Sequence, residues 1–499
     1  MFKKLIFQTL LIASLTVSVS SCNKYLELRP QDGITRDKFW QSKEQIKSAV
    51  IGCYIAMQVP FGGRPAPAES FFVWGELRAD MIAPGLGMGV DELNVVNATI
   101  LSTNGVTDWR NFYRVINFCN TIIDFAPGVK DVDATLTDTE LRGYLAEALT
   151  IRALMYFYLV RSFGDVPLKL KSTSSDSELV QLAKTPQPDV LKQIVADLKL
   201  AETYATTTYG DNASDKGRVT IYTVYAMEAD VYLWMDNYNE CIAATDKIIN
   251  SNKFGLVAGN NNSWFNILYG VGNSAESIFE LQFDQQSLNP YFTMFSTNRR
   301  RYLAGPNTLD EVFGVDLVND INFDLRGIDA SIRPDDQSIY KYIGLTPDVA
   351  RTQDVSYAHW IFYRYADILL LKAEACAQIG RGQDALTIIN TLRTRAHAIT
   401  VSAESPSPED VAGVTNYVLR ERARELAYEG KRWYDLLRNA KRNNYARLDL
   451  LTAAAIRSVP GTVQQSALNK LKDKNSHYFP IFQYEIQTDP NLIQNPFYK

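Results

Sequence analysis

Apolar residues recur every three or four positions along most of this chain, and that spacing predicts amphipathic helices. The segment 141–163 shows this most clearly, because its apolar residues share one face and Gly164 and Pro167 follow as stop signals. An earlier helix is predicted over 35–57, with Thr35 as its N-cap. The pattern therefore indicates a mainly α-helical protein.

Two segments far apart in the chain, 220–250 and 363–396, resemble one another. Each contains an apolar helical stripe, a short turn and a second stripe. Small residues sit at matching positions of the paired helices: Ala229 with Cys241, and Ala373 with Ala385. Small residues there let antiparallel helices approach closely, as in tetratricopeptide repeats of about 34 residues. Two unrelated helical hairpins are the alternative.

Two loop-rich regions interrupt the helices, at about 59–107 and 255–357. Gly, Asn, Asp and Pro are frequent in the longer region, and the alternation over 278–283 predicts one short strand there. Loops this extensive inside a compact domain are usually functional. We therefore expect the binding residues in these two regions.

The first 21 residues have the layout of a secretory signal. Lys3 and Lys4 precede an apolar run, and small residues lead up to Cys22. This predicts a lipoprotein signal peptide over 1–21 and a lipid chain on Cys22, where two acyl chains would anchor the protein stably. An ordinary cleaved signal with a chance cysteine is the alternative. After residue 21 no apolar run reaches 18 residues, so we expect no transmembrane helix.

The composition argues against several classes of partner. A formal net charge of −5 does not suit a nucleic-acid-binding protein. None of the three histidines is paired at metal-ligand spacing, so we predict neither a metal nor a cofactor. The remaining cysteines lie among apolar residues and are expected to be small buried hydrophobes, with a disulfide between two of them left open: Cys53, Cys119, Cys241 and Cys376.

No motif points to catalysis. The patterns GxSxG, HExxH and GxxxxGK[ST] are absent. Glycoside hydrolysis needs two carboxyl groups about 5–9.5 Å apart across a cleft. The nearest candidates are Glu76 with Asp80, and Asp91 with Glu92, but spacing alone makes no cleft. We expect solvated or ion-paired carboxylates there, and no enzyme.

The segment 421–438 is rich in both charges. Glu421, Glu425 and Glu429 are spaced four apart, which predicts one face of a helix that Gly430 ends. Neighbouring arginines at 422, 424 and 432 are expected to neutralise them. Structural ion pairing is likewise the interpretation for Arg364, Asp367 and Glu374.

Several stretches, taken in order, resemble the SusD/RagB family of outer-membrane nutrient-binding lipoproteins of the Bacteroidota. Phe482 departs from the pattern, since a proline is common there. The matching stretches are CNKYLELRP (22–30), RSFGDVPL (161–168), KGRVT (216–220), RYADILLLKAEA (364–375), INTLRTRA (389–396), ERARELAYEGKRWYDLLR (421–438) and FPIFQYEIQTDPNLIQNPFY (479–498).

This resemblance implies a single SusD-like domain over 22–499, with tetratricopeptide-type hairpins, a loop-rich region and a few short strands. It implies a lipid-anchored protein on the outer membrane, facing the cell exterior. Such a protein captures glycans for a SusC-like TonB-dependent transporter and performs no chemistry. The same scaffold binding peptides, or a surface glycoside hydrolase, are the alternatives. The sequence does not name the sugar.

Sugars present apolar CH faces and a rim of hydroxyls, which aromatic rings and polar side chains can cover. Residues of these types in the two loop-rich regions are the predicted ligand contacts. They are Trp74, Arg78, Asp80 and Asn94 in the first region, and Trp264, Tyr269, Tyr291 and Tyr302 in the second.

Overall fold

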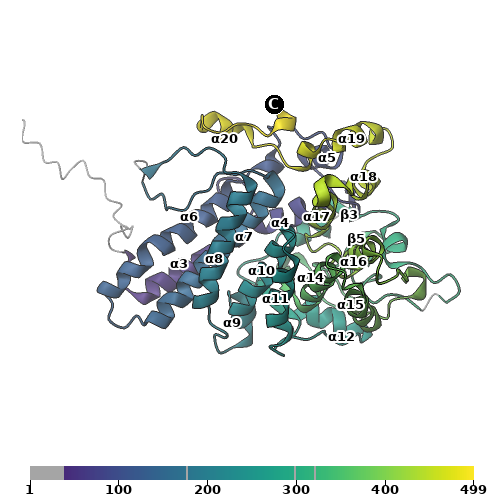
Figure 1. Ribbon diagram of the computed structural model, residues 1–499, viewed down its shortest axis with the longest axis horizontal. Helices are drawn as coiled ribbons and strands as arrows, with labels where there is room; N and C mark the ends of the chain where they lie inside the picture. The colour runs from purple at the N-terminus through teal and green to yellow at the C-terminus, as the bar shows by residue number, and fades with distance from the viewer. Residues whose placement is uncertain (1–38, 176–177, 297–298, 320–321) are drawn as a thin grey trace, which may run out of the picture.

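The computed structural model describes residues 39–175, 178–296, 299–319 and 322–499 (Figure 1). Cys22, Thr35 and the predicted signal peptide lie outside these residues. Among the described residues, no helix combines the length and the apolar character that crossing a bilayer requires.

Paired helices form the body of the molecule. Along the described chain the partners α3–α6, α7–α8, α10–α11 and α14–α15 pack against one another, and α11 packs on α14 (Figure 1). The two hairpins with matching sequences are therefore neighbours in space. The bounds are α3 (Lys43–Gln58), α6 (Arg110–Phe125), α7 (Asp138–Phe163), α8 (Gln187–Tyr204), α10 (Ile221–Trp234), α11 (Tyr238–Ile249), α14 (Tyr365–Gln378) and α15 (Gly382–Arg395).

Two further helices, α16 (Val411–Glu425) and α17 (Arg432–Tyr445), continue the array. The C-terminal segment then runs along one edge of the molecule, drawn in yellow in Figure 1. The shorter helices are α4 (Pro67–Glu76), α5 (Val90–Val96), α9 (Asn212–Gly217), α12 (Asn261–Phe265), α13 (Tyr291–Phe295), α18 (Leu448–Ala455), α19 (Gln464–Leu471) and α20 (Gln483–Thr488).

Local signals explain where these helices begin and end. The helix predicted over 141–163 is confirmed as α7, which starts one turn earlier at a capping box of Thr137 and Glu140 and stops at Gly164. The start predicted at Thr35 lies outside the described residues and stays a prediction. The helix predicted over 35–57 is not continuous, because the chain turns at residues 40–42 and α3 begins after a capping box of Ser42 and Gln45.

The strands are short and pair only in twos within the described residues. The strand predicted over 278–283 is confirmed as β2 (Ser277–Leu281), which pairs antiparallel with β6 (Trp360–Arg364). The loop-rich region also contains pairings that the sequence did not predict. These are β1 (Ile82–Pro84) with β3 (Tyr302–Ala304), and β4 (Ile332–Arg333) with β5 (Ser338–Ile339).

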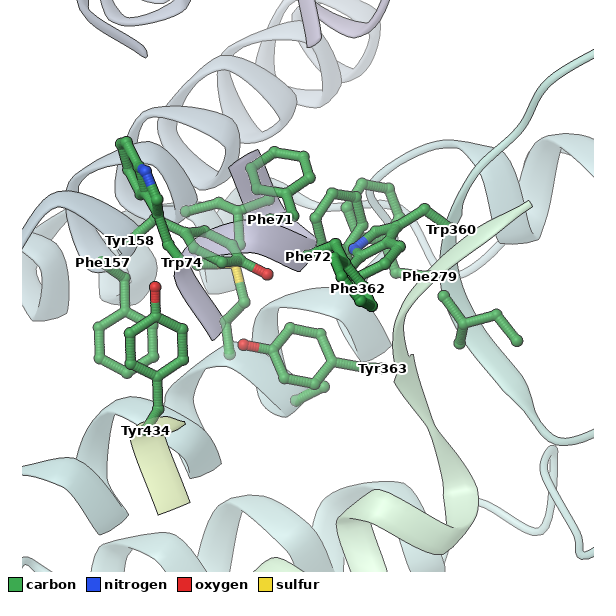
Figure 2. Close-up of a cluster of buried hydrophobic side chains, with 14 of the residues drawn as sticks. Phe71, Phe72, Trp74, Phe157, Tyr158, Phe279, Trp360, Phe362, Tyr363 and Tyr434 are labelled. Atoms are coloured by element: carbon green, nitrogen blue, oxygen red, sulfur yellow. The ribbon is translucent and has the colours of Figure 1, made fainter. Parts of the chain in front are cut away.

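Aromatic rings fill the junction between the helical array and the loop-rich region. Figure 2 shows Phe71, Tyr158 and Phe362 among them. The Phe71 ring centroid lies 4.6 Å from that of Tyr158 and 5.1 Å from that of Phe362, so α4, α7 and β6 share one core. The four cysteines at 53, 119, 241 and 376 are free and buried, as predicted.

A buried ion-pair network joins α16 to its surroundings. Arg364 lies 2.6 Å from Glu276, 2.7 Å from Glu425 and 2.9 Å from Glu429, measured between nitrogen and oxygen. Burial alone would raise the pKa of the Glu425 carboxyl, but Arg395 and Arg364 hold it well below its usual range.

Structural ion pairing of these charged residues is confirmed, but the predicted partners are right only for Arg424, which pairs with Glu421 at 2.9 Å, whereas Arg422 and Arg432 pair with Asp435 and Asp80. Asp367 pairs with Arg422 at 2.9 Å, and Glu374 pairs with Arg438 at 2.7 Å. The predicted helix through Glu429 is wrong, because α16 ends at Glu425 and the chain turns before Gly430, whose φ is 71°. Ion pairs from other elements hold Glu429 outside the helix.

Candidate functional site

A groove of about 610 Å³ opens beside α4, on the edge of the molecule that carries α5 and the C-terminal segment. The turn 61–64, α4, α5, the 3₁₀ turn η2 (Gly105–Thr107) and the start of α6 surround it. The lining residues are Gly63, Arg64, Pro65, Glu69, Ser70, Val73, Trp74, Gly87, Gly89, Val90, Asp91, Glu92, Gly105, Val106, Asp108, Asn111, Phe112 and Arg301.

The floor of the groove is aromatic. The Trp74 ring stacks on Phe112 with centroids 4.3 Å apart and planes 16° from parallel. The indole N–H of Trp74 donates to the Val106 carbonyl at 2.8 Å, which fixes the ring against η2. Both side chains are buried, with 0% and 1% of their surface exposed, so they form a rigid layer beneath the groove and present almost no open surface to it.

A tight turn forms one side. Phe61 and Arg64 exchange backbone hydrogen bonds of 3.2 and 3.0 Å across Gly62 and Gly63, whose φ angles are 60° and 70°. Two successive residues with positive φ define a type I′ hairpin, which favours glycine at both positions. The Asn111 amide donates to the Pro65 carbonyl at 2.8 Å and ties this turn to α6.

Cations and aromatic rings form the rim beside this turn. Arg64 lies 2.5 Å from the Asp108 carboxylate, and Arg110 reaches the same carboxylate at 2.5 Å. The Arg110 guanidinium also lies 4.6 Å from the ring centroid of Tyr484, and Arg64 lies 5.7 Å from that of Phe482. The residue that departs from the family pattern, Phe482, thus contacts the rim.

An ion-pair cluster forms the opposite side. Arg301 donates to Glu69 at 2.6 Å and to Glu92 at 2.8 Å. The Tyr302 hydroxyl donates to Glu92 at 2.5 Å, and the second oxygen of Glu92 accepts the Gly89 N–H at 2.8 Å. These contacts hold the first turn of α5 against the segment 299–304.

The two loop-rich regions meet at this groove. The β1–β3 pairing joins them, and the N–H groups of Gly85 and Gly87 donate to the carbonyls of Arg301 and Arg300 at 2.9 and 3.0 Å. A Cβ on Gly87 would lie 1.7 Å from the Arg299 carbonyl oxygen, so only glycine permits this approach.

The structure places one of the predicted contacts, Trp74, in the lining of the groove. Tyr302 is fully buried behind the groove wall, where its hydroxyl donates to Glu92. Asp80 instead pairs with Arg432 at 2.8 Å, which lowers the pKa of its carboxyl despite burial. Asn94 accepts a hydrogen bond from the Thr99 hydroxyl at 3.2 Å and does not line the groove.

The other predicted contacts lie in the core. Arg78 lies between the rings of Trp433 and Phe479. Tyr269 donates to Glu429 at 3.0 Å, while Trp264 and Tyr291 are fully buried among other rings. None of these four residues lines the groove, so their placements do not support contact with a ligand bound there.

Sequence reasoning missed several groove residues, above all Arg64, Glu69 and Arg301. One signal was available: FGGR, residues 61–64, is a hairpin turn with two glycines. Nothing in the sequence indicated the contact between Arg301 and Glu69, whose positions are more than 200 residues apart.

The carboxylates of the region are not arranged for catalysis. Glu76 is fully buried and accepts the backbone N–H groups of Gly430 and Lys431 at 2.8 and 3.1 Å. Both oxygens of Glu92 are occupied, so neither is placed to protonate a leaving group. Among the described residues, no group of three or more His, Cys, Asp or Glu side chains could hold a metal ion.

Comparison with protein families assigns the chain. A model described as "SusD family" matches residues 337–498, and one described as "Starch-binding associating with outer membrane" matches residues 24–233. The chain belongs to the SusD family. Proteins of the SusD family are non-catalytic binding proteins, which confirms the expectation that this chain is not an enzyme.

Individual SusD-like proteins support the assignment. SusD-like protein P38 of Formosa agariphila is 26% identical over 492 residues, covering 88% of this chain and 92% of that protein. A SusD superfamily structure from Bacteroides vulgatus matches with a TM-score of 0.75 at 23% identity, over 92% of this chain and 100% of the other. Surface glycan-binding protein A of Bacteroides uniformis matches with a TM-score of 0.72 at 21% identity, over 92% and 100%. These matches confirm the mainly helical SusD-like fold.

Proposed function

We propose that this SusD-family protein binds a glycan in the groove beside α4 and delivers it to a SusC-like TonB-dependent transporter. The observation that carries the proposal is the groove itself, with a polar rim above a rigid layer formed by the buried Trp74 and Phe112 side chains. Its volume of about 610 Å³ lies within the range of small-molecule sites, about 300–1,000 Å³.

The chemistry of the groove suits a carbohydrate. The exposed Pro65 and the half-buried Val106 line the groove and can cover the CH face of a sugar ring, which excludes water from both surfaces. Around it, guanidinium and carboxylate groups of Arg64, Glu69, Asp91 and Arg301 can donate to and accept from hydroxyls. The name of the family model over 24–233 supports starch or a related glycan as the ligand class.

Obstruction of the groove tests the binding site. Ser70 lies on α4 and lines the groove, so Ser70→Trp should fill it and weaken glycan binding at least about tenfold in calorimetry. Ser48→Trp is the matched control, because Ser48 is exposed on α3 and does not line the groove. Its affinity should equal that of the unmodified protein.

The ligand for this test comes from glycan and peptide arrays probed in parallel. Binding to glycans that Ser70→Trp removes would support the proposal. Binding to peptides alone would replace glycan by peptide as the ligand class, and unchanged glycan affinity in a folded Ser70→Trp protein would exclude this groove.

The surface next to the groove supports delivery to a partner. Leu86 and Val90 are 91% and 75% exposed beside the groove, and exposed apolar side chains in one area mark protein contacts. A transporter covering this face would enclose the ligand. We also propose that lipid on Cys22, outside the described residues, anchors the protein to the outer membrane.

Affinity purification from the native outer membrane tests delivery. The tagged protein should recover a TonB-dependent transporter in mild detergent, and Leu86→Asp should reduce that recovery. Val132→Asp is the control, because Val132 is also exposed but lies beyond the far end of α6, after Phe125. Recovery of no transporter under any condition, or equal recovery with both variants, would contradict this part of the proposal.

A further inference from the structure

A second, much smaller cavity lies under the C-terminal segment, where α5 and α19 are neighbours (Figure 1). Its volume of about 20 Å³ exceeds the 10–15 Å³ or so that one water-sized guest needs. It is separate from the groove. Its lining comprises Arg78, Val95, Val96, Ala98, Ile100, Trp433, Ala455, Val459, Lys470, Leu471, Ser476, Phe497 and Tyr498.

Arg78 brings a positive charge to this cavity. Its side chain is only 7% exposed, and its guanidinium lies 4.2 Å from the ring centroid of Trp433 and 3.8 Å from that of Phe479. Nη1 donates to the His477 carbonyl at 2.7 Å. Nε and Nη2 have no hydrogen-bond partner among the described residues. These two atoms carry the parallel N–H groups of the guanidinium fork, which together bind an anion side-on.

The other polar groups of the cavity also favour an anion. Lys470 supplies a second cation, and the buried Ser476 hydroxyl has no partner among the described residues. No Asp or Glu lines the cavity. Although burial lowers the pKa of Arg78 to about 10, its side chain keeps its charge at neutral pH.

The other buried arginines show what Arg78 lacks. Arg326, Arg364 and Arg422 each contact two or more carboxylates. A buried charge is costly unless an opposite charge or strong hydrogen bonds compensate it. Within the described structure, Arg78 has one carbonyl and two aromatic faces but no carboxylate.

We propose that this cavity binds a single chloride ion, held by Nε and Nη2 of Arg78 and the Ser476 hydroxyl, with Lys470 adding charge. The volume of about 20 Å³ suits a guest of roughly the size of one water molecule, which favours a monoatomic anion. Because α5 contributes Val95 and Val96 here and Asp91 and Glu92 to the groove, the ion would hold the groove wall to the C-terminal segment.

Bromide substitution tests the site directly. Crystals of the full chain grown in sodium bromide should give an anomalous difference peak within hydrogen-bond distance of Nη2 of Arg78. In solution, sodium chloride should raise the melting temperature saturably, relative to sodium gluconate at equal ionic strength, because gluconate cannot enter. A site without an anomalous peak, or equal melting temperatures in the two salts, would overturn the proposal.

A charge variant provides a second readout without altering Arg78. Lys470→Met should weaken the chloride response on the order of fivefold, as loss of one nearby unit charge implies. Lys472→Met is the matched control, since Lys472 is exposed on the same segment and does not line the cavity. Equal responses in both variants would count against the site.

Discussion

Glu76 is a carboxyl group enclosed in the core at the end of α4. One oxygen accepts the Gly430 and Lys431 N–H groups, and the other has no partner among the described residues. Burial raises the pKa of Glu76 from 4.5 to about 8, although the backbone N–H groups and Arg432 act in the opposite direction. The folded protein therefore keeps a proton on this carboxyl at neutral pH.

This shift predicts a pH dependence of stability. Between pH 4.5 and about 8 the folded state holds a proton that the unfolded chain has released, so the free energy of unfolding falls as pH rises. Glu76→Gln keeps an acceptor for the N–H groups and cannot ionise. Between pH 5 and pH 8.5, the free energy of unfolding of Glu76→Gln should rise relative to that of the unmodified protein by an amount on the order of a few kcal/mol.

Urea unfolding of both proteins across this pH range checks the prediction. The difference in unfolding free energy between variant and unmodified protein should grow with pH and then level off. A constant difference would mean that the carboxyl titrates alike in the folded and unfolded states.

Residue type alone did not decide which side chains face the ligand. Trp74 and Trp264 both lie in loop-rich regions of the sequence, yet Trp74 floors the groove and Trp264 is packed against Tyr269. The difference arises from tertiary contacts, above all from Phe112 on α6 stacking on Trp74. An aromatic residue in a loop-rich region therefore led to the groove in one case, and ligand contact by Trp74 stays a prediction.

At the scale of elements, the segment 85–89 determines the shape of the groove wall. Gly87→Ala should push this segment away from Arg299, because the added Cβ would meet a backbone carbonyl at 1.7 Å. We expect a stability loss of about 1–3 kcal/mol. Glycan affinity should also fall about tenfold as the Arg301–Glu92 contact is displaced.

Gly128→Ala is the control for this variant, because a Cβ there meets nothing within 4 Å. Its melting temperature and its calorimetric glycan affinity should both be close to those of the unmodified protein. If Gly87→Ala matched it in both measurements, the close approach at 85–89 would not shape the site.

Helices were the most predictable elements, since periodicity and caps are local. The pattern over 141–163 and the stop at Gly164 sufficed for α7. The sequence predicted the helix containing Glu425 to continue through Glu429. It does not, because Glu429 pairs with Arg364 and Lys341, which come from distant parts of the chain. The three-residue strands β1 and β3 were missed for the same reason, because they are remote from one another in sequence. The pair β4 and β5 is local, but strands of two residues are too short to show an alternating pattern.

At the scale of the whole molecule, the buried ion pairs around Arg364 connect β2, β6 and α16. Arg364→Met should cost about 3–5 kcal/mol, because three carboxylates would lose a buried counter-charge. Lys192→Met should change stability by less than about 0.5 kcal/mol, since its pair with Asp189 is exposed. Equal effects in urea unfolding would show that the network adds nothing beyond surface pairing.

The central claim is that the groove between the two loop-rich regions holds a glycan. A crystal structure of the protein with the tightest-binding glycan from the array tests it most directly. The account predicts a sugar ring over the Trp74–Phe112 floor, with hydroxyls reaching Arg64, Glu69 or Arg301. A glycan bound elsewhere on the molecule, with this groove unoccupied by sugar, would contradict the account.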